Sequence, residues 1–149
     1  KKFTDKPIII KLHPGDMVWK SVIVEPLIKQ FDPEIQIMVD GNLPKLIQSS
    51  SVVISIGITT VLLEANIFKK PTLTILFDPQ ERLSASSSGK TEFFNSDEQK
   101  RFENTLCDIL NNPETTKFFV KNGNEFVKNY LANHGVASEY LANRINENV

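Results

Sequence analysis

The sequence has few of the residues that build covalent cross-links and metal sites. It contains one cysteine, Cys107, and two histidines among 149 residues. A single cysteine cannot form an internal disulfide, and no group of cysteine and histidine residues has the spacing of a zinc site. The composition therefore predicts no structural metal and favours a reducing compartment, which we expect to be the cytoplasm.

An excess of one charge and a long apolar run are also absent. Lys and Arg together number 17 against 18 for Asp and Glu, which leaves a formal net charge of −1. We therefore expect no general electrostatic attraction to nucleic acid. No apolar run approaches the roughly 20 residues that a membrane-spanning helix needs. We expect a soluble chain that is not transmembrane.

The length and the apolar content fit one globular domain. Hydrophobic residues make up 40% of the chain, which is enough for one well-buried core at this length. Residues 1–6 contain neither an initiator methionine nor the apolar stretch of a signal peptide. We expect residues 1–149 to form a single domain that was cut from a longer polypeptide.

Short β-branched runs alternate with helical patterns along the chain, which is typical of βαβ units and a parallel sheet. We predict strands at Pro7–His13, Glu34–Val39, Ser51–Ile56 and Thr72–Phe77. We predict one helix that begins at Pro26 and two more at Leu43–Ile47 and Thr60–Phe68. The predicted fold class is α/β, a Rossmann-like parallel sheet with helices on both faces. The third strand is almost entirely apolar, as in a central strand covered on both sides.

The carboxy-terminal half contains a different kind of segment. Asp78–Ser96 is rich in serine, shows no apolar period and is long for a connection in a compact domain. We predict a mobile binding loop or lid there. From Asp97 onward the apolar residues recur with a helical period, and a last helix is expected after Gly135.

His13 is the first candidate functional residue, because it stands at the end of the first predicted strand. In an open α/β sheet, ligands bind outside the carboxyl ends of the strands. An imidazole at that edge could donate a hydrogen bond to a phosphate or act as a general acid or base. The alternative is that His13 merely ends the strand, with its imidazole bonded to a backbone carbonyl.

The second candidate lies where the third predicted strand runs into the helix that follows. Ser55 and Gly57 precede Thr59 and Thr60 at the start of that helix. Backbone N–H groups, hydroxyls and the positive end of the helix dipole would converge there, which predicts an anion-binding site. The alternative for each threonine is an ordinary helix cap.

Glu64 lies four residues after Thr60, so the two share one face of the helix. The carboxylate interrupts an apolar run and would need partners if it were buried. A ligand with its phosphate at the helix start could offer its ribose hydroxyls to Glu64. A solvated glutamate is the alternative.

Four other features have simpler explanations. The segment Gly89–Thr91 matches the end of a phosphate-binding loop, but the first glycine of that motif is absent. Trp19 could stack on a base, although packing is the commoner role. Cys107 is expected to be a small core residue, and His134 a surface residue between helices.

Taken together, these motifs resemble the carboxy-terminal, nucleotide-binding domain of GT-B glycosyltransferases. The resemblance is carried by Lys11–Pro14, by Val52–Ala65 with Lys70–Pro71 behind it, and by Asn133–Ala142. It extends over most of the chain, from Ile8 to Ile145. The most similar groups are UDP-N-acetylglucosamine 2-epimerases and the transferases that build capsule and teichoic-acid polymers.

The resemblance implies a role for each candidate residue. His13 would contact the diphosphate or the leaving group, and Glu64 would hold the ribose. Phosphate would be surrounded by the remaining four, Ser55, Gly57, Thr59 and Thr60. The ligand would be a nucleotide-diphosphate sugar of the UDP or CDP type, with no separate cofactor. Ile58 departs from the pattern, since such enzymes usually have Ser or Gly at that position.

Such enzymes place the acceptor on a preceding Rossmann-like domain, which these residues do not contain. The resemblance therefore implies three partners: a nucleotide sugar, the amino-terminal domain of the same polypeptide, and a glycan or polymer acceptor. The isolated chain should bind a donor without turning it over, and any membrane association would come from the full-length protein. Two alternatives remain, a fragment of a hydrolysing 2-epimerase and a non-catalytic nucleotide-sugar binding module.

Overall fold

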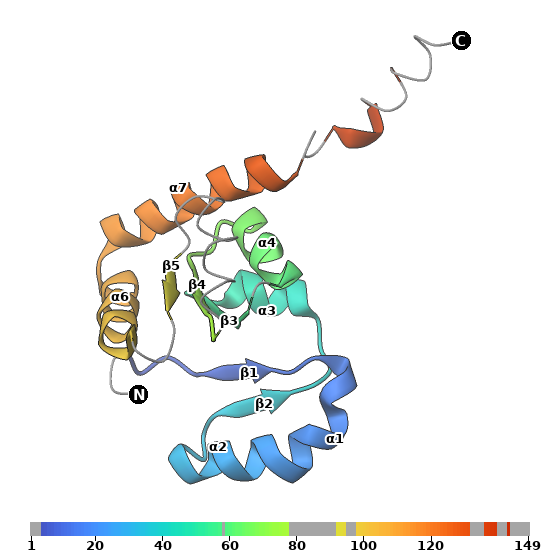
Figure 1. Cartoon of the computed structure of the whole chain (residues 1–149), viewed down its shortest axis with the longest axis vertical. Coiled ribbons are helices and arrows are strands. Elements are labelled where there is room, and N and C mark those ends of the chain that lie inside the picture. The colour runs from blue at the N-terminus through green and yellow to red at the C-terminus, as the bar shows by residue number, and fades with distance from the viewer. Residues whose placement is uncertain are drawn as a thin grey trace. The chain divides into compact units, whose positions relative to one another are not determined.

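The computed structural model describes residues 4–57, 59–77, 92–94, 98–131, 136–139 and 143 (Figure 1). The chain divides into two compact units, Lys1–Lys45 and Leu46–Val149, and each is described by itself. In the described ranges, no helix combines the length and the apolar character that crossing a bilayer requires. The structure is α/β with small parallel sheets, as predicted, and a single domain for the whole chain stays a prediction.

The first unit contains a pair of parallel strands, β1 (Ile9–Lys11) and β2 (Gln36–Met38), with Ile10 opposite Ile37. Both strands were expected, and both are shorter than the apolar patterns. The side chain of Lys11 ties their carboxyl ends together. Its ammonium group donates hydrogen bonds to the carbonyl oxygens of Leu12 and Val39.

A helical run connects these two strands. It consists of η1 (Pro14–Asp16), α1 (Met17–Trp19), η2 (Lys20–Val24) and α2 (Glu25–Phe31). The helix predicted to begin at Pro26 is α2, which begins one residue earlier and has this proline in its first turn, whereas the helical run from Pro14 to Val24 was not predicted. Proline lacks the N–H that an α-helix interior requires. The chain accommodates it by widening the preceding turn into a π-helix, in which the Glu25 N–H donates to the Lys20 carbonyl.

Side chains of this helical run are more exposed than its apolar sequence suggests. Trp19 is 58% exposed and Phe31 79%. The expectation that Trp19 packs in the protein interior is therefore wrong. In the described part of this unit, the apolar residue that is fully buried is Val39, at 5% exposure.

The second unit is built on three parallel strands, β3 (Val53–Ile56), β4 (Thr72–Ile75) and β5 (Glu92–Phe94), in that order across the sheet. Ser55 lies opposite Thr74. The strands β3 and β4 were expected. Among the described strands of this unit β3 lies at the edge of the sheet rather than in its centre, and its Ile54 and Ile56 are 43% and 67% exposed. A continuous apolar pattern identifies a strand without identifying its neighbours.

The strand β5 lies within Asp78–Ser96, where a mobile binding loop or lid was predicted, and gives part of that segment regular structure. Its three residues pair in parallel with β4, with Thr74 opposite Phe93. A strand this short, next to a serine-rich run, gives no measurable period-2 pattern. The rest of the predicted lid, residues 78–91 and 95–96, lies outside the described residues.

Two helices of the amino-terminal half follow the prediction closely. The helix α3 (Leu43–Ser49) contains the expected Leu43–Ile47, and α4 (Thr60–Ile67) ends one residue before the predicted end. After α4, Lys69 adopts a left-handed conformation with φ of 55°, and the Lys70 N–H donates to the Ala65 carbonyl. This is the usual way in which the last free carbonyls of a helix are satisfied.

The helices α6 (Gln99–Asn111) and α7 (Pro113–Tyr130) confirm the helical prediction for this region. The long helix α7 packs against both α6 and α4 (Figure 1). Leu73 of β4, Ile109 of α6 and Phe119 of α7 form a buried cluster. Cys107 was expected to be a core residue but is only half-buried.

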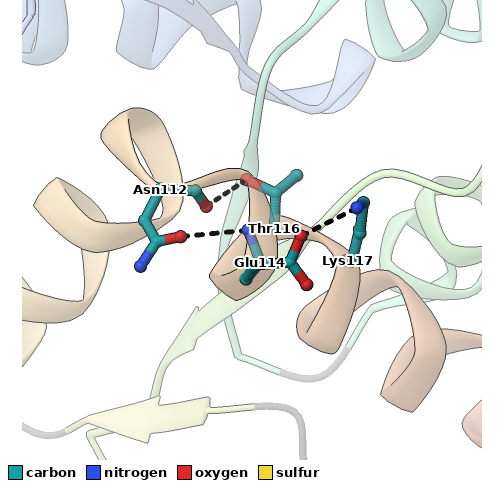
Figure 2. A network of polar contacts seen from close by, with 4 residues as sticks. All are labelled: Asn112, Glu114, Thr116 and Lys117. Atoms are coloured by element: carbon teal, nitrogen blue, oxygen red, sulfur yellow. Dashed lines mark hydrogen bonds and ion pairs between the residues drawn. The ribbon is translucent and has the colours of Figure 1, made fainter.

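The junction between α6 and α7 is fixed by polar contacts (Figure 2). The Asn112 side chain caps α7 by accepting a hydrogen bond of 3.0 Å from the Glu114 N–H. The Thr116 hydroxyl lies 2.7 Å from the Ile109 carbonyl and 3.1 Å from that of Asn112. Lys117 and Glu114 form an exposed ion pair of 2.8 Å one turn into the helix. The asparagine cap and the following proline together determine where α7 begins.

Candidate functional site

The turn from β3 to α4 depends on the backbone conformation of Gly57. Its φ of +72° lies in the left-handed region that favours glycine. A Cβ atom at this position would meet nothing within 4 Å, so the requirement for glycine is conformational rather than steric. The Gly57 N–H donates to the Ile75 carbonyl at 2.9 Å. The turn is thereby attached to the carboxyl end of β4, the sheet edge at which ligands of parallel sheets bind.

Ser55 supports this turn from inside the protein. The residue is 8% exposed, and its hydroxyl donates to the Gly57 carbonyl at 3.1 Å. The same oxygen lies 3.3 Å from the fully buried Thr74 hydroxyl. Since the single proton of Ser55 is used on Gly57, the Thr74 hydroxyl is the donor in the second bond. Ser55 thus holds the turn in shape, and its predicted contact with phosphate stays a prediction.

Thr59 and Thr60 stand at the start of α4, and both are exposed. Thr59 is the cap residue, with φ of −132° and ψ of 159°, but its side chain makes no capping hydrogen bond. Thr59 therefore occupies the position of an ordinary helix cap without making the hydrogen bond of one. The first N–H groups of a helix have no partner within it. The exposed hydroxyls thus lie beside the first N–H groups of the helix, at the positive end of its dipole. Of these groups, the Leu62 N–H donates to the Thr59 carbonyl at 3.1 Å.

Glu64 lies one turn further along α4, on the same face as Thr60. It is half-buried, which agrees with the apolar sequence around it. No hydrogen bond or ion pair joins its carboxylate to another residue in the described part of the chain. A partly buried carboxylate that bonds no described residue is available to hydroxyl groups of a ligand.

His13 belongs to the first unit and lies two residues after the end of β1. It is exposed, and its Nδ1 accepts a hydrogen bond of 3.0 Å from the Gly15 N–H. The alternative in which the imidazole is bonded to a backbone carbonyl is therefore not the geometry found. The structure brings the other five predicted residues together in one strand, turn and helix of the second unit. The part of His13 in that site stays a prediction.

Several features named from the sequence lie outside the described residues: Ile58, the segment Gly89–Thr91 and His134. Sequence reasoning also missed two residues that shape the site. Thr74 was recognised only as part of a strand, and the register that places it beside Ser55 is a tertiary property. Gly15 could have been found, since a glycine two residues after a histidine permits a close backbone approach to the ring.

Two surface hollows found among the described residues do not coincide with the candidate site residues. One hollow of about 390 Å³ is lined by the junction of α6 and α7, including Asn112 and Thr116. Another of about 170 Å³ lies in the first unit and includes Asp32 and Glu34. In the described ranges, no group of three or more His, Cys, Asp or Glu side chains could hold a metal ion.

Comparison with known proteins adds no assignment to this geometry. No family model matches the chain, and no match was found among curated proteins or solved structures.

Proposed function

We propose that the second unit binds the diphosphate and ribose of a nucleotide sugar at the β3–α4 turn, as the donor-binding half of a GT-B-type glycosyltransferase in surface polysaccharide or glycan synthesis. One observation carries the proposal. The left-handed turn at Gly57 leads into a helix that begins with two exposed threonines, whose hydroxyls bond no described residue. Glu64 follows one turn later and has no partner among the described residues.

The start of α4 has the chemistry that an anionic group requires. Backbone N–H groups and the helix dipole favour a negative charge at this end. The hydroxyl groups of Thr59 and Thr60 add hydrogen-bond donors, and neither is used to cap the helix or to bond another described residue. We place the phosphate groups here.

Glu64 explains why the ligand would be a nucleotide rather than a free phosphate. Residues four apart on a helix are separated by about 6 Å along its axis. A phosphate at the start of α4 therefore leaves room for a ribose over the next turn. A carboxylate is a strong acceptor for two sugar hydroxyls, which are the groups that a phosphate site by itself cannot recognise.

The proposed fold is Rossmann-like with the GT-B arrangement. In its support, β3, α4 and β4 form a parallel βαβ unit, the building block of doubly wound sheets. By this proposal the β3–α4 turn is at the ligand-binding edge. The contribution of His13, a contact with the diphosphate or leaving group, belongs to the same proposal.

Calorimetric titration of the 149-residue chain with UDP, CDP, UMP and uridine tests this function. We expect the two diphosphates to bind most tightly and uridine at least tenfold more weakly, because the phosphate contacts are charge-assisted. Equal affinity for uridine and UDP, or no binding of any of the four, would contradict the proposal.

A matched pair of variants locates the phosphate contact. Thr60→Val keeps the side-chain shape and removes the hydroxyl, and Thr115→Val makes the same change on α7. We expect Thr60→Val to weaken UDP several-fold and to leave uridine unchanged, while Thr115→Val affects neither. A Thr60→Val chain that binds UDP as the unaltered chain does would move the phosphate away from the start of α4.

A further inference from the structure

His13 is held in a turn made by its own neighbours. The Gly15 N–H donates to His13 Nδ1 at 3.0 Å, two residues along the chain. This is the geometry by which short polar side chains stabilise turns through the N–H two residues on. Pro14 fixes φ between the two residues and has no N–H of its own, so Gly15 offers the first available donor.

This hydrogen bond decides which ring nitrogen of the neutral imidazole carries the proton. A backbone N–H can only donate, so Nδ1 must present its lone pair to Gly15. In a neutral imidazole the other nitrogen then carries the proton. From this geometry we infer that His13 is a hydrogen-bond donor through Nε2, and that Gly15 is the positioning residue that sets this tautomer.

The close approach of the His13 ring to the backbone requires glycine at position 15. A Cβ atom there would lie 3.1 Å from His13 Nδ1 and 3.7 Å from Cε1. The first distance is tighter than an ordinary van der Waals contact, so any side chain would displace the ring by a few tenths of an ångström. The absence of a side chain lets the imidazole edge approach the backbone closely enough to be bonded by it.

The tautomer determines what His13 can do for a ligand. Nε2 lies across the ring from Nδ1, and the residue is exposed. No described residue forms a hydrogen bond with Nε2. A donor in that position suits an anionic oxygen, and it cannot take a proton as a neutral general base. Resting on the proposed function, the oxygen is one of the donor diphosphate, whose charge His13 would stabilise as the sugar leaves.

Nuclear magnetic resonance reads the tautomer directly. A long-range ¹H–¹⁵N spectrum of the histidine-labelled chain, at a pH where the ring is neutral, distinguishes a protonated Nε2 from a protonated Nδ1. His134 is the other histidine, and a spectrum of His13→Gln identifies its signals by elimination. We expect the Nε2–H form at His13 and a larger share of the Nδ1–H form in Gly15→Ala. A protonated Nδ1 in the unaltered chain would overturn the inference.

Two amide variants test the donor role with UDP as the probe. The amide of glutamine can reach the position of Nε2, whereas that of asparagine reaches only the position of Nδ1. We expect His13→Gln to bind UDP within a few-fold of the unaltered chain and His13→Asn to bind it roughly tenfold to a hundredfold more weakly. Equal affinity in both variants and in the unaltered chain would overturn the donor role.

These outcomes separate this inference from the proposed function. If none of the nucleotides binds and the spectrum still shows the Nε2–H form, the proposed function is contradicted and the tautomer stands. If UDP binds through the β3–α4 turn and His13 carries its proton on Nδ1, the inference about His13 fails and the proposed function stands.

Discussion

The carboxamide of Asn66 on α4 fills the space above Gly123 of α7. A Cβ atom at position 123 would lie 2.1 Å from Asn66 Oδ1 and 2.8 Å from its Cγ. Asn66 is 1% exposed, and its Oδ1 lies 3.4 Å from the Thr72 hydroxyl. The polar side chain of one helix thus packs directly on the backbone of the other, and glycine is the residue that permits this approach.

Gly123→Ala should destabilise the chain by about 1–3 kcal/mol, because the added methyl group overlaps the buried Asn66 side chain. The sign of the change in unfolding free energy distinguishes this contact from an exposed helix position. There, the same substitution would stabilise the chain by about 0.5–1 kcal/mol through higher helix propensity. Urea unfolding of both proteins measures the difference. Adding Asn66→Ala to Gly123→Ala should recover part of the loss, and a stabilised Gly123→Ala chain would show that α4 and α7 do not meet at this point.

Gly57→Ala should cost about 1–2 kcal/mol of unfolding free energy, because an L residue is strained at φ of +72°. No steric clash adds to this cost, since the space around the new Cβ is open. Gly57→Asn is the control, because asparagine tolerates the left-handed region better than alanine. Thermal melting should rank the three chains glycine, asparagine, alanine in decreasing order. A ranking with asparagine lowest would show that a steric clash of the added side chain, rather than backbone strain at positive φ, causes the loss of stability.

Ser55→Ala should destabilise the chain by about 1–3 kcal/mol, because it leaves the Gly57 carbonyl and the buried Thr74 hydroxyl without their partner. Replacing both partners, Ser55→Ala with Thr74→Val, should cost less than the sum of the two single changes. Denaturant unfolding of the four chains completes the cycle. Strict additivity would show that the two hydroxyls are not coupled.

The strands β1 to β4 could be predicted because each lies within an apolar, β-branched segment that ends in a turn signal. The helix α4 could be predicted because lysines and a proline mark its end. The sequence could not show that β3 lies at the edge among the described strands, since burial depends on which strand is its neighbour. Nor could it show β5, whose three residues are too few for a period, or the π-helix that accommodates Pro26.

The candidate site was predictable to the level of residue types. A glycine and two threonines between a strand and a helix indicate an anion site by chemistry alone, and Glu64 stands out because it interrupts an apolar run. The buried position of Ser55 could not be predicted, because it follows from the register between β3 and β4. The bond from Gly15 to His13 is local and could have been predicted from the His-Pro-Gly order.

The most direct test of the account is the affinity of Glu64→Gln for UDP. If the carboxylate accepts two ribose hydroxyls, the amide weakens a charge-assisted interaction of about 1.5–3 kcal/mol, and the affinity should fall roughly tenfold to a hundredfold. The melting temperature should hardly change, because no described residue depends on this carboxylate. Glu125→Gln, the same change at an exposed position of α7, should leave UDP binding unaltered.

Calorimetric titration of UDP into the three chains, with melting curves recorded on the same samples, decides the matter. We expect a selective loss of affinity in Glu64→Gln at unchanged stability. Unchanged affinity together with a lowered melting temperature would contradict the nucleotide site, because Glu64 would then belong to the internal structure of the protein.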